Sequence, residues 1–136
     1  MLATAQVVEA PLLTVDEMCR RKGVGRIDLL KIDTEGFDAF VLRGASAMMS
    51  RNAVDIVLFE YNTFWPFDTH TLASTTRWLH DEFGFECFME ASQLLRLTGG
   101  CWDARFETKQ WSNVWCASPR TRVGSAVAHL FDRLSV

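Results

Sequence analysis

The stretch IDLLKIDTEG, residues 27–36, decides the fold class that the sequence predicts. Its first part, Ile27 to Asp33, is short and mostly apolar, and the residues Thr-Glu-Gly end it. A strand that is covered on both faces has this composition, which is typical of parallel sheets. Gly36 permits a sharp turn, because glycine adopts backbone conformations that other residues avoid. We therefore predict a buried strand that turns abruptly into a helix.

Helical segments flank this strand on both sides. A helix is predicted over Thr14–Lys22, where the first residue and Glu17 form a capping-box pattern and Gly23 suits the helix end. Downstream, apolar residues recur at helical spacing over 37–49, and Gly44 weakens or splits that helix. The other expected elements, in chain order, are a strand at 53–62, a helix at 69–83, strands at 85–90, 92–100 and 112–118, and a helix at 125–136.

This alternation of strands and helices predicts parallel strands joined by crossover helices. The expected fold class is α/β, with an open, doubly wound sheet. We expect residues 1–119 to form the domain, and residues 120–136 to form a linker and a C-terminal amphipathic helix. Ligands of such sheets bind beyond the carboxyl ends of the strands. That rule selects two places, residues 33–36 and residues 60–62.

Composition excludes several classes of partner. The chain has 136 residues, which fits one domain, and its 14 basic and 17 acidic residues give a net charge of −3. Scattered basic residues without an excess argue against nucleic acid or an anionic membrane as a partner. The sequence lacks an apolar run of membrane-spanning length, and its first residues do not resemble a secretory signal. These features predict a cytoplasmic location.

The four cysteines, Cys19, Cys87, Cys101 and Cys116, form no CxxC pair. Their spacing suits neither a zinc site nor a dense disulfide framework. We expect reduced and mostly buried thiols, and no metal site.

Two carboxylates stand at the end of the first predicted strand. If the extended geometry persists, Asp33 and Glu35 point to the same side, together with Lys31. Such a pair can bind a ligand's hydroxyl or amino groups, act as a general base, or hold a hard cation. The alternative is structural: one carboxylate caps the helix that begins near Phe37, and Lys31 is an ion-pair partner. The spacing leaves both interpretations open.

A third carboxylate, Glu60, ends the next predicted strand, and we expect it beside Asp33 if the two strands are adjacent. The alternative for Glu60 is a solvated loop acid. Tyr61 and Asn62 follow it at the strand end, and His70 lies in the loop beyond, where a substrate can reach it. We take these three residues as candidate substrate-binding residues.

The residues 12–45, LLTVDEMCRRKGVGRIDLLKIDTEGFDAFVLRGA, closely resemble the middle of FkbM-family methyltransferases. The likeness rests on the start of the first helix, the strand and turn at Ile27–Gly36, and the helix end at Val41–Ala45. It extends over roughly residues 7–119, including the strand that carries Glu60 and the late strand SNVWCAS.

This resemblance implies a class I, Rossmann-like methyltransferase fold with S-adenosylmethionine as the cofactor. It also implies O-methylation of a small-molecule acceptor, at a hydroxyl that often belongs to a sugar or natural product. Asp33 occupies the position of the acidic residue that lies near the methyl donor and the acceptor in this fold. Glu35 and Glu60 would face the same cleft.

The chain also departs from the family pattern. A Gly-rich turn of the form DxGxNxG, which begins the family's cofactor site, does not occur here. The resemblance therefore implies the C-terminal half of the domain, without its first three strands. The strand at Ile27–Ile32 would then have a bare edge. That edge can be covered by the residues AQVVEA at 5–10, by a second copy, or by a separate polypeptide. The alternative function is a non-catalytic binding or assembly module, or a gene fragment, that retains half of the fold.

Overall fold

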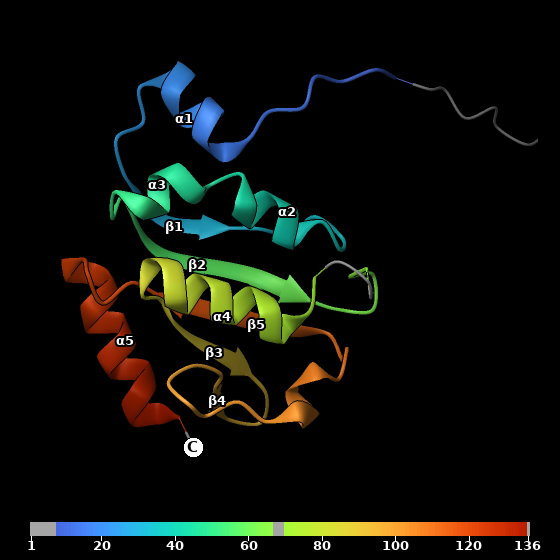
Figure 1. The fold of residues 1–136 in the computed structure, drawn as a ribbon, viewed down its shortest axis with the longest axis vertical. Coiled ribbons are helices and arrows are strands. Elements are labelled where there is room, and N and C mark those ends of the chain that lie inside the picture. Colours follow the sequence, from blue (N-terminus) through green and yellow to red (C-terminus); the bar gives the residue numbers. More distant parts are fainter. Residues whose placement is uncertain (1–7, 67–69, 136) are drawn as a thin grey trace, which may run out of the picture.

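One five-stranded sheet organises the chain in the computed structural model, which describes residues 8–66 and 70–135 (Figure 1). The strand order is β1-β2-β5-β3-β4. The strands are β1 (Ile27–Lys31), β2 (Val54–Tyr61), β3 (Glu86–Glu90), β4 (Leu94–Arg96) and β5 (Ser112–Ala117). The helices are α1 (Val15–Lys22), α2 (Asp38–Arg43), α3 (Ser46–Ser50), α4 (Leu72–Phe83) and α5 (Arg122–Leu134), with a 3-10 turn η1 (Ala104–Glu107) before β5. The predicted α/β class is confirmed.

The sheet is mixed, which corrects the expectation of parallel strands throughout. β1 and β2 pair in parallel as predicted, but β5 is antiparallel to both β2 and β3, and β4 is antiparallel to β3. The reason lies in the segment before β5, which arrives at the carboxyl end of β2, where Ser112 pairs with Tyr61. The chain therefore enters β5 from that edge and runs back. β1, β2 and β3 still share one direction, so their carboxyl ends lie at one edge of the sheet.

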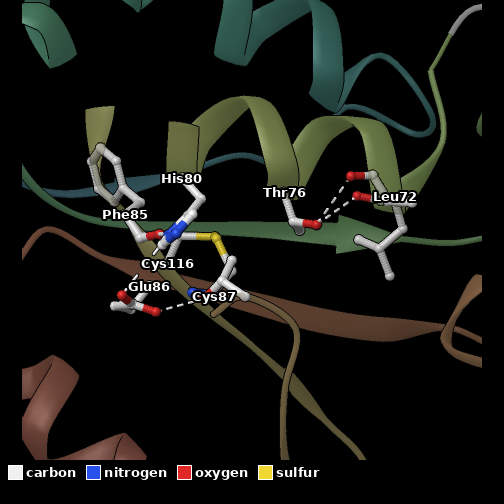
Figure 2. The surroundings of a disulfide bond; sticks show 9 residues. Leu72, Thr76, His80, Phe85, Glu86, Cys87 and Cys116 are labelled. Atoms are coloured by element: carbon white, nitrogen blue, oxygen red, sulfur yellow. Dashed lines mark hydrogen bonds and ion pairs between the residues drawn. A yellow bond between two sulfur atoms is a disulfide. The ribbon is translucent and has the colours of Figure 1, made fainter. Parts of the chain in front are cut away.

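Helices cover both faces of this sheet. Phe131 of α5 contacts Phe88 and Trp115, with ring centroids 5.6 Å and 5.9 Å apart. Neighbouring strand residues point to opposite faces. The neighbours of those two, Cys87 and Cys116, accordingly lie beneath α4 (Figure 2). The main core is on the α4 face, where the fully buried side chains include Val57, Phe59, Tyr61, Leu72 and Leu79.

The first helix forms as predicted. The Thr14 side chain accepts a hydrogen bond from the Glu17 N–H at 3.1 Å, and Gly23 ends α1 with φ 67°. The helix expected over 37–49 is split after Gly44 into α2 and α3. Asp16 of α1 helps to start the second piece, because its carboxylate accepts from the N–H groups of Ala47 and Met48 at 2.8 Å and 2.9 Å.

α4 starts at a capping box. The Thr71 side chain accepts from the Ser74 N–H at 3.0 Å, and the Ser74 hydroxyl accepts from the Thr71 N–H at 3.0 Å. The start predicted at Thr69 lies outside the described residues. Within residues 8–66 and 70–135, each helix is too short or too polar to cross a membrane.

β1 stands at the end of the strand order, and the prediction that both its faces are covered is wrong. Leu29 is 50% exposed, and Asp28 and Lys31 are exposed as well. The reason is the position of α5, which packs mainly over β5, β2 and β4. Val8 to Ala10 do not pair with this edge, and residues 5–7 of the candidate covering segment lie outside the described residues.

Two cysteines form a disulfide, so the expectation of reduced thiols is wrong for them. Cys87 of β3 and Cys116 of β5 are directly paired, fully buried, and 4.1 Å apart at Cα (Figure 2). Their separation of 29 residues hides this contact from any spacing rule. Cys19 and Cys101 are free. Disulfides persist mainly in oxidising compartments, so this bond does not support the cytoplasmic location predicted from the sequence.

Loss of the disulfide should lower the free energy of unfolding. A bond between residues 29 positions apart stabilises a fold by about 3–4 kcal/mol in the chain-entropy description. We expect the double variant Cys87→Ala/Cys116→Ala to lose that amount in urea unfolding. Cys101→Ala, which removes an exposed thiol, is the matched control and should stay within about 0.5 kcal/mol of the parent. Equal stability of the double variant and the control would contradict a structural role for the bond.

Candidate functional site

The carboxyl edge of the sheet brings Asp33 and Glu60 to adjacent strands. In the parallel ladder Lys31 pairs with Leu58, and Ile32 donates its N–H to the Leu58 carbonyl at 2.8 Å. Asp33 and Glu60 each follow two residues after the paired residues. If the extended backbone of β1 continues to Asp33, strand alternation places both carboxylates on the face of Lys31 and Leu58. The register brings the two strand ends side by side, and the adjacency of the two acids stays a prediction.

Lys31 neutralises part of the charge at this edge. Its Nζ lies 3.0 Å from Asp33 Oδ2, and both side chains are about half exposed, at 56% and 50%. The structural alternative predicted this ion pair with Lys31, and the pair is present. It also predicted that one carboxylate caps α2, and this cap is absent, because α2 has Phe37 at its N-cap and no side-chain hydrogen bond there. Among the described residues, Asp33 Oδ1 has no protein donor, so this oxygen is open to a ligand.

The turn after β1 separates Glu35 from Asp33. The extended geometry does not persist, since Glu35 has φ 51° and Gly36 has φ 100°. A non-glycine residue in the left-handed region stores local strain, which is more common at functional positions than elsewhere. Strand alternation consequently does not place Glu35 beside Asp33, and its exposed carboxylate lies on the turn itself.

Gly36 brings the turn into direct contact with the loop after β2. A Cβ at this position would lie 2.4 Å from the Phe64 carbonyl oxygen and 3.0 Å from its Cβ. Only a residue without a side chain allows this approach. The two places selected from the sequence, 33–36 and 60–62, are therefore packed into one continuous edge.

Asp38, a residue that the sequence analysis missed, ties the same two loops together. Its buried carboxylate accepts from the Thr34 hydroxyl at 3.0 Å and from the Glu60 N–H at 3.3 Å. A carboxyl group with these two partners holds both strand ends in place. The sequence places Asp38 in the first turn of the helix that follows β1, so it could have been selected as a candidate. Its hydrogen bond to the Glu60 N–H on the next strand could not be predicted from the sequence.

Glu60 is partly buried and oriented by Asn62. The Asn62 side chain donates to Glu60 Oε2 at 2.9 Å and accepts from the Phe64 N–H at 2.9 Å. Asn62 is itself fully buried. The structure thus places Asn62 behind Glu60 and away from solvent.

Tyr61 points to the opposite face from Glu60 and is fully buried. Its hydroxyl donates to Glu107 Oε1 at 2.7 Å, and burial together with this carboxylate raises the Tyr61 pKa well above its usual range. Glu107 also accepts from the N–H groups of Leu72 and Ala73 at 2.8 Å and 3.1 Å, which caps α4. Sequence reasoning missed Glu107, because nothing local links it to a helix 34 residues earlier.

His70 lies apart from the carboxylates, against the face of α2. Its ring meets Phe40 edge-on at 4.7 Å. Partial burial and the nearby Arg43 lower the His70 pKa, so the imidazole is neutral at pH 7. The described contacts do not join His70 to Asp33 or Glu60.

The third parallel strand also ends in an acid that was overlooked. Glu90 closes β3, and Asn113 of β5 donates to its Oε2 at 2.7 Å. Asn113 is paired with Glu60 across the β2–β5 ladder. A polar row therefore runs along the carboxyl edge from Asp33 through Glu60 and Asn113 to Glu90. Applying the strand-end rule to the third predicted strand would have found Glu90. Within the described residues, no group of three or more His, Cys, Asp or Glu side chains is arranged to hold a metal ion.

A family model described as the methyltransferase FkbM domain matches residues 3–87, which is more than half of the chain. The matched region contains Asp33, Glu35, Glu60 and the loops that join them. It ends within β3, before Glu90 and Asn113. No curated protein and no solved structure matches the chain.

The close approach at Gly36 allows a direct test of whether the turn after β1 packs against the loop after β2. We expect Gly36→Ala to lower the free energy of unfolding by about 2–3 kcal/mol, because alanine adds both a clash and an unfavourable φ. Gly25→Ala is the matched control, since a Cβ there meets nothing within 4 Å. Urea unfolding of both variants measures the difference. Equal stabilities would mean that the loops are not in contact.

Proposed function

Because the chain belongs to the FkbM methyltransferase family, we propose that it acts as an S-adenosylmethionine-dependent O-methyltransferase domain with its reaction centre at Asp33 and Glu60. The observation that supports this proposal is the register of β1 and β2. It sets two carboxylates on neighbouring parallel strands at the sheet edge where ligands of α/β folds bind.

The residues at this edge fit part of the cofactor. S-adenosylmethionine carries a sulfonium and an ammonium group, and the exposed carboxylates of Asp33 and Glu35 complement positive charge. Phe37 is 65% exposed beside them and offers an aromatic face. The Gly-rich turn expected for the rest of the cofactor is not in this sequence. We therefore assign only the methyl-bearing side of the cofactor to these residues.

When bound, the cofactor supplies an electrophilic methyl group. Asp33 uses Oδ2 to pair with Lys31, and its open Oδ1 can accept the hydrogen of an acceptor hydroxyl. The ion pair with Lys31 then orients the Asp33 carboxylate. Glu60, held by Asn62, is set to hydrogen-bond a second hydroxyl of the acceptor.

The two buried candidates receive different roles in this proposal. Asn62 orients Glu60, and Tyr61 holds α4 through Glu107, so both act as positioning residues. His70 stays a candidate for contact with the acceptor, because it is partly exposed and neutral.

The bare edge of β1 supports the proposal that these strands are the C-terminal half of a methyltransferase sheet. An apolar edge strand with Leu29 half exposed is a site for further strand pairing. The covering strand can come from a second copy or from a separate polypeptide, because Val8 to Ala10 of the candidate segment 5–10 do not pair with this edge. The alternative function, a non-catalytic binding or assembly module, rests on the absent Gly-rich turn.

Calorimetric titration of the 136-residue chain with S-adenosylmethionine tests the function. We expect saturable binding that Asp33→Ala weakens at least tenfold, or about 1.4 kcal/mol. Asp28→Ala is the matched control, because Asp28 is an exposed acid on the same strand. No binding by a folded chain would favour the non-catalytic module, and equal affinity of both variants would remove Asp33 from the site.

Sedimentation tests whether a second copy of the chain covers the edge of β1. Pairing of β1 with a second copy predicts concentration-dependent association that Leu29→Lys abolishes. Leu130→Lys, at a residue with 44% exposure on α5, is the control and should associate like the parent. A stable monomer at high concentration would exclude the second copy as the covering strand.

A further inference from the structure

A hollow outside the matched family region opens beside the polar row. It has a volume of about 610 Å³ and lies between the end of β3 and the segment that leads into β5. Glu90, Phe106, Gln110 and Trp111 are among its walls. Glu90 is the last member of the polar row, so the hollow opens at the carboxyl edge of the sheet, on the far side of β5 from Asp33.

The aromatic wall of the hollow is unusually exposed. Trp111 is 60% exposed, and its ring meets Phe64, itself 58% exposed, edge-on at 5.8 Å. Phe64 also carries the backbone carbonyl that touches the turn at Gly36. An exposed indole held by a neighbouring ring offers a flat apolar surface of fixed position. The same pair of rings connects the hollow to the turn after β1.

Polar groups border this aromatic surface. Glu90 Oε2 accepts from Asn113, which fixes the carboxylate, and its Oε1 has no protein donor among the described residues. Gln110 and Thr108 add amide and hydroxyl groups to the wall. A flat apolar wall with carboxylate, amide and hydroxyl groups at its rim suits a ring with C–H faces and a rim of hydroxyls. Such a ring is a sugar.

The spacing of the strands sets the length of the ligand. Trp111 directly precedes β5, and β2 separates β5 from β1 in the sheet. With neighbouring strands about 4.8 Å apart, a ligand must span roughly 10 Å from Trp111, and roughly 14 Å from Glu90 on β3, to reach Asp33. A single sugar ring is too short for either span, so the ligand must contain at least two linked rings.

From these observations we infer that the hollow is an acceptor subsite, in which the distal ring of a glycoside at least two rings long stacks on Trp111 and hydrogen-bonds Glu90. This inference rests on the proposed function for the role of the near ring, whose hydroxyl reaches Asp33. The distal subsite itself is independent of the methyl donor. The residues assigned to this subsite lie beyond residue 87, where the family match ends.

Saturation-transfer NMR on the full chain, without methyl donor, tests the subsite. The probes are cellobiose and lactose, with methyl β-D-glucopyranoside as the single-ring comparison. We expect both disaccharides to bind at least tenfold more tightly than the single ring. Trp111→Ala should weaken disaccharide binding at least tenfold, Trp111→Phe should retain most of it, and Glu90→Gln should weaken it severalfold. Leu130→Ala truncates an exposed apolar residue of α5 that does not line the hollow, and this variant should bind like the parent.

Circular dichroism on each variant separates loss of fold from loss of binding. The inference is overturned if neither disaccharide receives saturation transfer, if the single ring binds as tightly as the disaccharides, or if Trp111→Ala binds like Leu130→Ala. Failure of the proposed function gives a different pattern: disaccharide binding that depends on Trp111, with no calorimetric signal from S-adenosylmethionine. Donor binding that depends on Asp33, with no effect of Trp111→Ala, would keep the function and remove the subsite.

Discussion

The parallel pairing of β1 with β2 is the constraint on which the candidate site depends. It sets Lys31 opposite Leu58, so Asp33 and Glu60 follow at equivalent places, and on the same face if the extended backbone of β1 continues to Asp33. A slip of one residue would turn one of the two carboxylates to the other face. Asp38 and the close approach at Gly36 then hold the two strand ends in that register. The chemistry proposed for this edge therefore begins with backbone hydrogen bonds.

Features set by local sequence could be predicted, and features set by distant contacts could not. The caps of α1, the break at Gly44 and the ends of β1 and β2 close to Asp33 and Glu60 all follow from residues a few positions apart. The direction of β5 depends on where a long connection returns to the sheet, which no periodicity records. The Cys87–Cys116 bond likewise depends on two strands becoming neighbours.

The candidate site shows the same division. The position at a strand end was enough to select Asp33 and Glu60, but the same rule also selected Tyr61. Because Tyr61 directly follows Glu60, its side chain points to the opposite face and lies in the core. Burial of Asn62 and the contacts of Asp38 and Glu107 are tertiary properties of side chains from three separate segments. Glu90 could have been predicted from the sequence, because it stands at the carboxyl end of a predicted strand, as Asp33 and Glu60 do.

The disulfide has a consequence for how motion is distributed across the sheet. It links β3 to β5, the strand that pairs with β2, while β1 has a partner on one side alone among the described residues. Amide protection against hydrogen exchange should therefore fall from the β3–β5 pair toward β1, because the free energy of local opening falls in the same direction. The strand that leads to Asp33 would then be the most mobile of the three parallel strands. A ligand bound at the carboxyl edge would reduce the mobility of this strand.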